Sequence, residues 1–330
     1  MYKLSIVLPT YNRKQQLMQV IDGLESQTFN KDDFEVIIVS DGSTDGTHQC
    51  MEQLKTPLNL SWFKQTNQGV AATRNHGFAK ARGEIILFID DDVVPDKDLL
   101  TQHYQTHLEA GMLKNLVVIG PMLSPPNHQY KPWVEWEQSM LYKQYDSINR
   151  GDWEPTARQF YTGNSSIHLT FLKDSGGFDA TFLRAEDIEL AFRLAEKGAK
   201  FVFNNKAIGY HYAQRSYASW ANIPYSYGCN DVIFTVQHGQ TWLIPTVMEE
   251  YGERHLFIRL MNKLCMDRAL ISNMLQSIFR VTANTSHAIG LKSISRASYS
   301  FIFNIRHYQG MSDQLGGRTR FFQLLALHGR

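Results

Sequence analysis

The sequence has little of what marks a secreted or membrane-spanning protein. It contains three cysteines, Cys50, Cys229 and Cys265, which are far apart and form no CxxC pair. This spacing argues against a disulfide framework or a cysteine-based zinc site. No apolar run approaches the roughly 18 residues of a membrane-spanning helix, and residues 1–8 are too short and too polar for a secretory signal. We expect a cytoplasmic protein, either free or peripheral on the inner face of the membrane.

Common nucleotide-binding and hydrolase signatures are missing as well. No GxGxxG follows the first apolar segment, no GxxxxGK[ST] occurs, and there is no GxSxG elbow. A dinucleotide-binding domain, a P-loop NTPase and an α/β-hydrolase are therefore disfavoured. The phosphates of a bound nucleotide would have to be held by a cation and by side chains.

Charge is unevenly distributed along the chain. Residues 254–330 contain 11 Lys and Arg and 2 acidic residues, a balance of +9, whereas residues 1–253 contain 22 and 30, a balance of −8. The overall net charge of +1 hides this contrast. An acidic body with a basic C-terminal segment predicts different partners for the two parts.

The segment 85–92 has the most informative chemistry. Five apolar residues, Ile85-Ile86-Leu87-Phe88-Ile89, predict a buried strand, and Asp90-Asp91-Asp92 follow directly. Adjacent carboxylates repel one another and need a counter-charge. A divalent cation bound to a phosphate-bearing substrate would supply one. The alternative is a solvated acidic turn.

Short apolar segments alternate with segments of helical spacing through the first hundred residues. Strands are predicted at 4–8, 34–39, 58–64 and 85–89, and helices at 14–26, 47–54 and 69–82. This alternation predicts an α/β fold with a mostly parallel central sheet flanked by helices. Polar clusters follow three of the strands, at 10–12, 41–43 and 90–92. Because ligands bind beyond the carboxyl ends of such strands, we expect one shared ligand site there.

Further polar segments lie in the middle of the chain. Residues 121–136 are rich in proline and aromatic residues and predict a surface segment crossing the mouth of the site. Glu186-Asp187 precede an apolar helical pattern, so helix capping is their simplest explanation. His211 lies among aromatic residues, a setting in which histidine is usually structural.

Several separated motifs together resemble the family 2 glycosyltransferases, which are inverting enzymes with the GT-A fold. The likeness covers about residues 3–215, and its combination of motifs in this order is specific although each motif alone is weak. The matching segments are Ser5 to Asn12, Val39 to Asp45, Gln68-Gly69, Ala72 to Gly77, Phe88 to Asp92, Gly163-Asn164, Gly176 to Asp179, Glu186 to Leu190, and His211.

The resemblance implies a nucleotide-sugar donor, most often a UDP-sugar, and Mg²⁺ or Mn²⁺. It assigns donor binding to the segment Pro9-Thr10-Tyr11-Asn12, with Thr10 and Asp41 at the base and Asp41 accepting from a pyrimidine N–H. Arg74 would neutralise part of the donor charge. The donor residues as a set are Pro9, Thr10, Tyr11, Asn12, Asp41, Arg74, Asp90, Asp91, Gly163 and Asn164, with Gly163-Asn164 near the transferred sugar.

The resemblance also implies roles for the carboxylates. Asp90 to Asp92 form the DxD motif, in which Asp90 or Asp91 faces the ribose and Asp92 binds the metal. His211 would add a metal or diphosphate contact. Asp187 would be the catalytic base, with Glu186 as the second choice, because one carboxylate suffices for an in-line displacement with inversion.

The predicted function is transfer of one sugar to an acceptor hydroxyl, in cell-surface polysaccharide or glycolipid synthesis. The acceptor would be a saccharide or a lipid-linked saccharide. No Gln-x-x-Arg-Trp segment occurs, which disfavours a processive synthase. The alternatives are a nucleotidyltransferase of related sheet architecture and a non-catalytic sugar-nucleotide-binding protein.

These assignments predict three parts of the chain. Residues 1–115 would form the nucleotide-sugar half, 116–240 the acceptor and catalytic-base half, and 241–330 a basic, mainly helical extension. Apolar residues recur at helical spacing between Leu256 and Ile278, with basic residues among them. Two interpretations stay open: a helical subdomain or homodimer interface, and a basic amphipathic surface on an anionic membrane. No nucleic-acid recognition motif is present.

Overall fold

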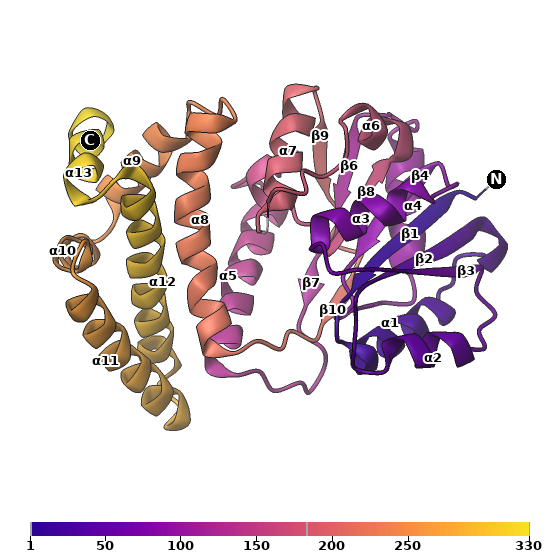
Figure 1. Ribbon diagram of the computed structural model, residues 1–330, viewed down its shortest axis with the longest axis horizontal. Coiled ribbons are helices and arrows are strands. Elements are labelled where there is room, and N and C mark those ends of the chain that lie inside the picture. The colour runs from indigo at the N-terminus through magenta and orange to yellow at the C-terminus, as the bar shows by residue number, and fades with distance from the viewer. Residues whose placement is uncertain (1, 183, 330) are drawn as a thin grey trace. The chain divides into compact units, whose positions relative to one another are not determined.

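The computed structural model describes residues 2–182 and 184–329. It divides into two compact units, which we describe separately. The sheet unit comprises residues up to His128 and Gln138–Ala213, and the helical unit comprises Gln129–Glu137 and the residues from Gln214 onward (Figure 1).

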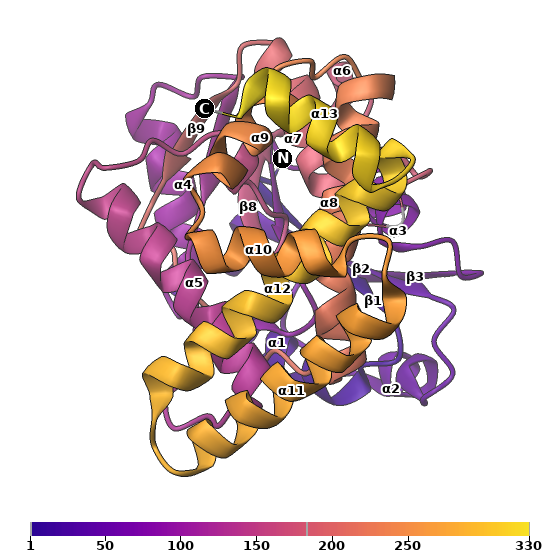
Figure 2. The ribbon, with the colours of Figure 1, turned by 90° about the vertical axis from the view of Figure 1, so that its left-hand side faces the viewer.

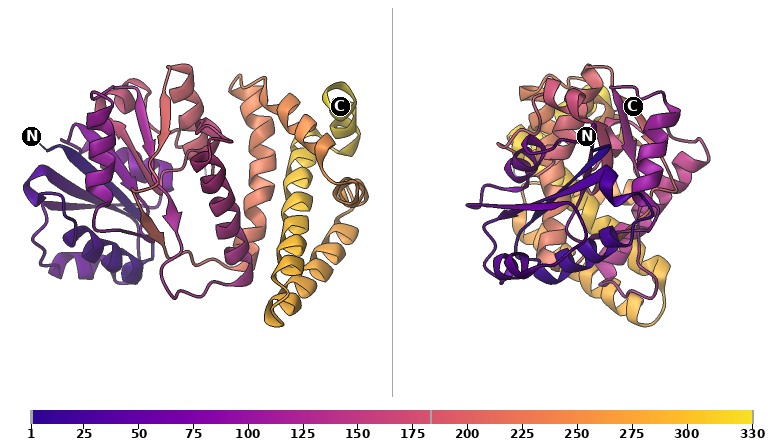
Figure 3. Two further views of the ribbon diagram at one scale, coloured as in Figure 1. Left: turned by 180° about the vertical axis from the view of Figure 1, so that it is seen from behind. Right: turned by 90° about the vertical axis from the view of Figure 1, so that its right-hand side faces the viewer.

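The sheet unit is built on a seven-stranded sheet with the order β3-β2-β1-β4-β8-β6-β9. Figure 3 shows the ribbon from two further sides. Strands β1 to β4 are parallel where they pair, β8 is antiparallel to both β4 and β6, and β9 is parallel to β6. The strands are β1 Leu4–Thr10, β2 Phe34–Asp41, β3 Leu60–Gln65, β4 Ile85–Ile89, β6 Leu116–Ile119, β8 Asn164–His168 and β9 Lys200–Phe203. A smaller sheet has the order β5-β10-β7, from β5 Val93–Pro95, β10 Gly209–His211 and β7 Met122–Leu123.

The central strands are buried on both faces. Every residue of β1, β2 and β4 is buried, as expected for parallel strands covered by helices on both sides. Pairing between β1 and β4 ends at Val7 opposite Phe88, while β1 continues along β2 to Thr10. Pro9 has no N–H and lies beyond the last residue paired with β4, where the sheet can do without that donor. The sheet therefore opens between the carboxyl ends of β1 and β4.

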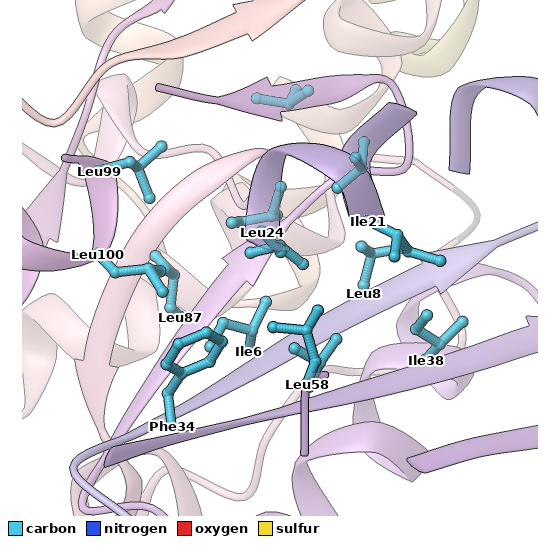
Figure 4. Close-up of a cluster of buried hydrophobic side chains, with 14 of the residues drawn as sticks. Ile6, Leu8, Ile21, Leu24, Phe34, Ile38, Leu58, Leu87, Leu99 and Leu100 are labelled. Carbon is cyan, nitrogen blue, oxygen red and sulfur yellow. The ribbon is translucent and has the colours of Figure 1, made fainter. Parts of the chain in front are cut away.

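Helices cover the sheet and complete its core. The helices of this unit are α1 Lys14–Glu25, α2 Thr47–Gln53, α3 Val70–Ala79, α4 Leu99–Glu109, α6 Leu169–Asp174 and α7 Glu186–Glu196, with the short 3-10 helices η1 Lys31–Asp33 and η2 Ala157–Gln159. Ile21 and Leu24 of α1 pack against Ile6, Leu8 and Leu87 of the strands (Figure 4). Their spacing places one apolar face of α1 on the sheet.

Helix α3 lies very close to β1. A Cβ atom on Gly77 would meet Cγ1 of Val7 at 2.5 Å, so only glycine allows this approach. The contact fixes α3 against the centre of the sheet. Arg74 is carried one turn earlier on the same helix.

The helical unit contains most of the C-terminal third of the chain. Its helices are α8 Tyr217–Gln237, α9 Leu243–Glu253, α10 Leu256–Cys265, α11 Ala269–Ala288, α12 Lys292–Leu315 and α13 Arg318–His328. Gly228 of α8 and Gly310 of α12 approach the backbone of the opposite helix so closely that a Cβ would lie 1.9 Å from His307 O and 2.1 Å from Tyr225 O. These glycines let the two long helices pack backbone to backbone. Across the described chain, no helix has the length and hydrophobicity to cross a membrane.

The strands and helices predicted between residues 4 and 89 are confirmed within a few residues. The prediction for 121–136 is wrong in part, because β7 begins at Met122 and helix α5 spans Pro132–Asn149. Proline suits the first turn of a helix, where its missing N–H costs nothing, and its presence masked the helical pattern. Helix α5 contributes residues to both units.

The boundaries of the two units differ from those of the three parts predicted from sequence. Strands β6, β8 and β9, from the predicted second part, complete the same sheet as β1 to β4. Strand β8 joins them because it pairs with β4 on one side and β6 on the other. The boundary near residue 213 also precedes the predicted boundary at 240. The division at 115 remains a functional prediction about two halves of one site.

Candidate active site

The loops after β1 and β2 are bonded to each other at the carboxyl edge of the sheet. The Thr44 N–H donates to Asn12 Oδ1 at 2.7 Å, and the Asn12 N–H donates to Ser43 Oγ at 3.0 Å. Asn12 adopts a left-handed backbone conformation with φ 54°, which asparagine tolerates better than most residues. Pro9 and Thr10 are buried at the end of β1, and Tyr11 is half exposed beside them.

Asp41 is held rigidly at the end of β2. Its buried carboxylate accepts from Gln65 Nε2 at 2.9 Å, from the Gln68 N–H at 2.8 Å and from the Gly69 N–H at 2.9 Å. Three N–H donors can support the ionised form of a carboxylate without any cation. The Gln68-Gly69 motif therefore has a structural role, which is to fix the Asp41 carboxylate at the carboxyl edge of the sheet. Contact of Asp41 with a base stays a prediction.

Arg13 contacts two of the three consecutive carboxylates. Its Nη1 atom lies 3.0 Å from Asp91 Oδ1 and 2.5 Å from Asp92 Oδ2. Burial raises the pKa of Asp91 to about 7, although Arg13 pulls it in the opposite direction. Arg13 was absent from the residues predicted from sequence. Its only signal was a basic residue directly after the 9–12 segment, within reach of any anion in that loop.

Arg74 connects the third carboxylate to a distant part of the chain. It donates from Nη2 to Asp90 Oδ1 at 2.8 Å and from Nη1 to Glu186 Oε1 at 2.6 Å. The guanidinium is buried and lies 5.7 Å from the ring centroid of Phe178. The DxD segment and the start of α7, separated by almost a hundred residues, are thus brought together through one cation.

Asp187 lies next to this ion-pair network and is not hydrogen-bonded to Arg74. Its Oδ1 accepts from the Ile188 N–H at 2.9 Å. Burial and the neighbouring Glu186 carboxylate raise the pKa of Asp187 above its usual range, and Arg74 offsets only part of that. The preceding Ala185 has φ 61°, so the chain enters α7 through a left-handed residue. A carboxylate with a raised pKa in such a setting is a candidate general base.

His211 and Asp92 form a two-residue candidate for metal binding. His211 Nε2 lies 3.6 Å from Asp92 Oδ1, and Gln138 Nε2 lies 3.1 Å from His211 Nδ1. Gln138 Oε1 is buried without a hydrogen-bond partner among the described residues. With the amide turned over, Oε1 would accept from a protonated Nδ1, and Nε2, which lies near Asp92, would be the nitrogen able to bind a metal.

The residues present fit a divalent cation only together with a substrate. Within 2–182 and 184–329, no group of three or more His, Cys, Asp or Glu residues is arranged to hold a metal ion. Mg²⁺ is commonly bound by one or two carboxylates plus substrate phosphates, which would match Asp92 and His211 with a diphosphate.

Gly163 and Asn164 have different environments. A Cβ on Gly163 would lie 3.0 Å from Asp90 Oδ2, so the glycine backbone directly borders the carboxylates. The Asn164 side chain is fully buried, and its Nδ2 donates to Pro121 O and Ala207 O. Gly163 thus borders the carboxylates, whereas the Asn164 side chain is enclosed in the core, and the placement of both residues near a transferred sugar stays a prediction.

A buried chain of hydrogen bonds fixes the orientation of the Asn164 side chain. Because Asn164 Nδ2 donates, its Oδ1 accepts from His103 Nε2 at 2.9 Å. His103 Nδ1 must then accept from Ser166 Oγ, and Ser166 Oγ accepts from His107 Nε2, both at 2.9 Å. Burial lowers the pKa of His103 to about 4 and of His107 to about 3, so both rings are neutral. These histidines hold the fold and are poor candidates for catalysis.

Comparison with known proteins agrees with this architecture. Residues 5–165 match the sequence model described as glycosyl transferase family 2. The matched region, just under half of the chain, is similar to this family. The GT-A type fold predicted from sequence is confirmed by solved structures that resemble most of the chain.

Two solved structures show the likeness in fold. The mannosyltransferase PcManGT from Pyrobaculum calidifontis, in complex with GDP-Man and Mn²⁺, is 16% identical, with 93% of this chain and 86% of that chain covered and a TM-score of 0.57. Residues 1–349 of S. aureus TarS, in complex with UDP, are 20% identical, with 94% and 91% covered and a TM-score of 0.50.

Curated relatives match shorter regions. An uncharacterised glycosyltransferase, YfnE of Bacillus subtilis, is 26% identical over 63% of this chain and 64% of its own length. Poly(ribitol-phosphate) β-N-acetylglucosaminyltransferase TarS of Staphylococcus aureus is 37% identical over 30% of this chain and 18% of its own length. Validoxylamine A glucosyltransferase of Streptomyces hygroscopicus is 28% identical over 62% and 51%. The matched regions thus span less than two thirds of each of these relatives.

Proposed function

We propose that the protein transfers one sugar from a nucleotide-sugar donor to an acceptor hydroxyl, by a single displacement that inverts the anomeric centre. One observation carries the proposal. Arg74 ties Asp90 and Glu186 together, and beside them Asp187 has a raised pKa and no hydrogen bond to that cation. A single in-line displacement requires one general base, placed beside the residues that bind the leaving diphosphate.

Each residue then has a defined task. Asp187 accepts the proton of the acceptor hydroxyl as its oxygen attacks the anomeric carbon. Glu186 remains bonded to Arg74 and orients it, which disfavours Glu186 as the base. The nucleoside diphosphate leaves toward the Asp90–Asp92 edge. Arg74 Nε is buried and has no hydrogen-bond partner among the described residues.

The proposed cofactor is Mg²⁺ or Mn²⁺, held by Asp92 and His211. When bound, such a cation stabilises the negative charge that develops on the leaving diphosphate. The donor is proposed to be a UDP-sugar, with Asp41 and Thr10 at the base. Support comes from TarS 1–349, solved with UDP, and from PcManGT, solved with GDP-Man and Mn²⁺. The hexosyl type of transfer is supported by the name of the validoxylamine A relative.

Calorimetry with nucleoside diphosphates tests the donor site. We expect UDP to bind more tightly with Mn²⁺ than without it, and Asp92→Asn to remove that difference. The matched control is Asp96→Asn, which changes a carboxylate on the loop after β5. If neither UDP nor GDP binds, with or without Mn²⁺, the proposed nucleotide-sugar function is wrong.

Product analysis separates the alternatives. A screen of nucleotide-sugars should release a nucleoside diphosphate and an inverted glycoside. Release of pyrophosphate would instead establish a nucleotidyltransferase, which attacks the α-phosphate. Tight donor binding with no turnover for any saccharide or lipid-linked acceptor would favour a non-catalytic binding protein.

We also propose that the helical unit binds an anionic membrane surface, which would bring the enzyme to lipid-linked acceptors for polysaccharide or glycolipid synthesis. Four apolar residues along α11 are more than half exposed: Leu270, Met274, Ile278 and Val281. Phe257 of α10 and Phe279 of α11 both pack on Phe301 of α12, at 4.8 Å between ring centroids, so α10 and α11 lie side by side on α12 (Figure 2).

The charges around this α10–α11 face favour an anionic lipid surface over a second protein. Lys263 and Arg268 are exposed beside the apolar residues. After residue 253 the sequence has only two acids, and both accept hydrogen bonds within the helical unit: Asp267 from the Arg318 N–H and Asp313 from the Tyr225 hydroxyl. Apolar burial plus about 1 kcal/mol for each cation near the surface would give reversible binding.

Vesicle flotation tests this surface. We expect the protein to float with vesicles containing phosphatidylglycerol and not with pure phosphatidylcholine. Lys263→Gln with Arg268→Gln should weaken binding about 30-fold, the equivalent of two lost charges. Leu270→Gln with Ile278→Gln should also release the protein. Suppose instead that the protein does not float and forms a concentration-dependent dimer that the apolar variant abolishes. The partner of this surface would then be a second copy of the chain and not a membrane.

A further inference from the structure

We propose that Arg13 is an internal counter-cation that holds Asp91 and Asp92 in the donor-free protein and must be displaced when a divalent cation binds. The proposal rests on the sugar-nucleotide function proposed above and adds a regulatory role for a residue that no motif assigns. It makes binding of the metal and binding of the diphosphate interdependent.

A single guanidinium nitrogen joins the two carboxylates. Arg13 Nη1 donates to Asp91 Oδ1 at 3.0 Å and to Asp92 Oδ2 at 2.5 Å, while His211 lies on the other oxygen of Asp92, at 3.6 Å. One oxygen of the proposed metal ligand is thus occupied by Arg13. A metal bound through both Asp92 and His211 would approach this cation closely, and like charges at such separations repel.

The carboxylates need such a cation whenever the donor is absent. The site gathers five carboxylates against two guanidinium groups, namely Asp90, Asp91, Asp92, Glu186 and Asp187 against Arg13 and Arg74. Arg74 is committed to Asp90 and Glu186. Without Arg13, Asp91 and Asp92, both nearly buried, would lose the guanidinium that contacts both of them. An uncompensated buried charge is strongly unfavourable.

The Arg13 side chain can move away from Asp91 and Asp92. Its side chain is 39% exposed, compared with 8% for each carboxylate, so it covers them from the solvent side. It also stands at the residue before α1, outside the helix itself. A diphosphate entering the rim would offer its oxygens as new partners, and arginine binds phosphate as well as carboxylate.

The exchange has a thermodynamic consequence. A metal ion alone must displace Arg13 and leave it without a partner, whereas a metal ion with a diphosphate gives Arg13 a replacement. Metal and nucleotide therefore assist each other, and this coupling is equal for both ligands. The protein would bind little free metal until a donor arrives.

Manganese binding in the absence and presence of UDP tests this role. Free Mn²⁺ measured by electron paramagnetic resonance gives its affinity without any turnover. We expect Arg13→Gln to bind Mn²⁺ alone about tenfold more tightly than the unaltered protein, because the competitor is gone. In this variant UDP should enhance Mn²⁺ binding less than it does in the unaltered protein. Arg13→Lys should behave like the unaltered protein.

A neighbouring lysine supplies the control for a general charge effect. Lys14→Gln removes one positive charge from the next residue, the first of α1, and it should leave Mn²⁺ affinity within about twofold. Equal Mn²⁺ affinity in Arg13→Gln and the unaltered protein, with UDP still enhancing it, would overturn the role of Arg13 and leave the proposed function standing. UDP binding that ignores Mn²⁺ in every variant would overturn the metal part of the proposed function instead. Thermal unfolding of each variant identifies any loss of folded protein.

Discussion

Two carboxylate clusters of this protein differ in how their charge is compensated. Asp90, Asp91 and Asp92, after β4, all hydrogen-bond to an arginine, through Arg74 or Arg13. At the start of α7, Glu186 hydrogen-bonds to Arg74, and Asp187 accepts instead from the next backbone N–H. The two clusters look alike in sequence, as runs of acids. Their chemistry differs because arginines from distant parts of the chain pair with all three acids of the first cluster but with only one acid of the second.

This contrast separates charge binding from proton transfer. Pairing with arginine favours the ionised form of a carboxylate, although at Asp91 burial outweighs Arg13 and raises the pKa to about 7. Carboxylates held by arginine suit a site where a cation or a phosphate-bearing ligand binds. A carboxylate that is buried beside another acid is a stronger base, because ionisation costs it more. The first cluster therefore fits the diphosphate end of a donor, and Asp187 fits the acceptor end.

The largest expected effect comes from the acid that lacks an arginine hydrogen bond. Asp187→Asn should lower kcat by a factor of about 10² to 10⁴, the usual contribution of a general base. Binding of UDP, measured by calorimetry, should change much less. Steady-state kinetics with the preferred donor and acceptor measures the loss.

Glu186→Gln is the matched control for that change. It neutralises the adjacent acid but keeps an oxygen that can accept from Arg74, so the loss in kcat should be clearly smaller. A greater loss in Glu186→Gln than in Asp187→Asn would reverse the assignment and make Glu186 the base.

The sequence predicted the fold and the candidate carboxylates because both depend on local patterns. A run such as Ile85 to Ile89 can be read as a strand without knowing its neighbours, and the residues after it fall at the rim by topology alone. The polar cluster at 10–12 is likewise a local pattern. These features need no knowledge of side-chain packing.

The counter-charges could not be predicted in the same way. Arg74 and Glu186 are 112 residues apart in sequence and Arg13 and Asp92 are 79 apart, and no periodicity relates them. Burial of Asn164 was also hidden, since its partners Pro121 and Ala207 come from distant loops. Helix α5 was missed because proline and aromatic residues obscured its pattern.

The second prediction concerns the cation that links the two clusters. Arg74→Met should lower the free energy of unfolding by about 3–5 kcal/mol, because Glu186 and Asp90 lose their cationic partner in a buried site. Urea denaturation followed by circular dichroism measures this. Arg150→Met removes an arginine from an exposed pair with Asp152 and should cost less than about 1 kcal/mol. Similar costs for both variants would mean that Arg74 does not compensate the clusters.

The smallest effect should appear in the pH dependence of the rate. A general base works only when it is deprotonated, and the pKa of Asp187 is raised by burial and by Glu186. As pH falls through that pKa, kcat/KM should fall about tenfold per pH unit, and this decline should begin at a higher pH than for an ordinary aspartate.

The same measurement on Glu186→Gln links the rate to the neighbouring charge. Removing the Glu186 carboxylate takes away a repulsion that disfavours ionised Asp187, so the acidic limb should move to lower pH. Lys173→Gln, which removes an exposed charge from α6, is the control and should leave the limb in place. Because Asp187 and Glu186 interact, the midpoint belongs to the pair, and its displacement carries the information. An acidic limb that stays unchanged in Glu186→Gln would show that the two acids are not coupled and would remove the electrostatic reason for choosing Asp187.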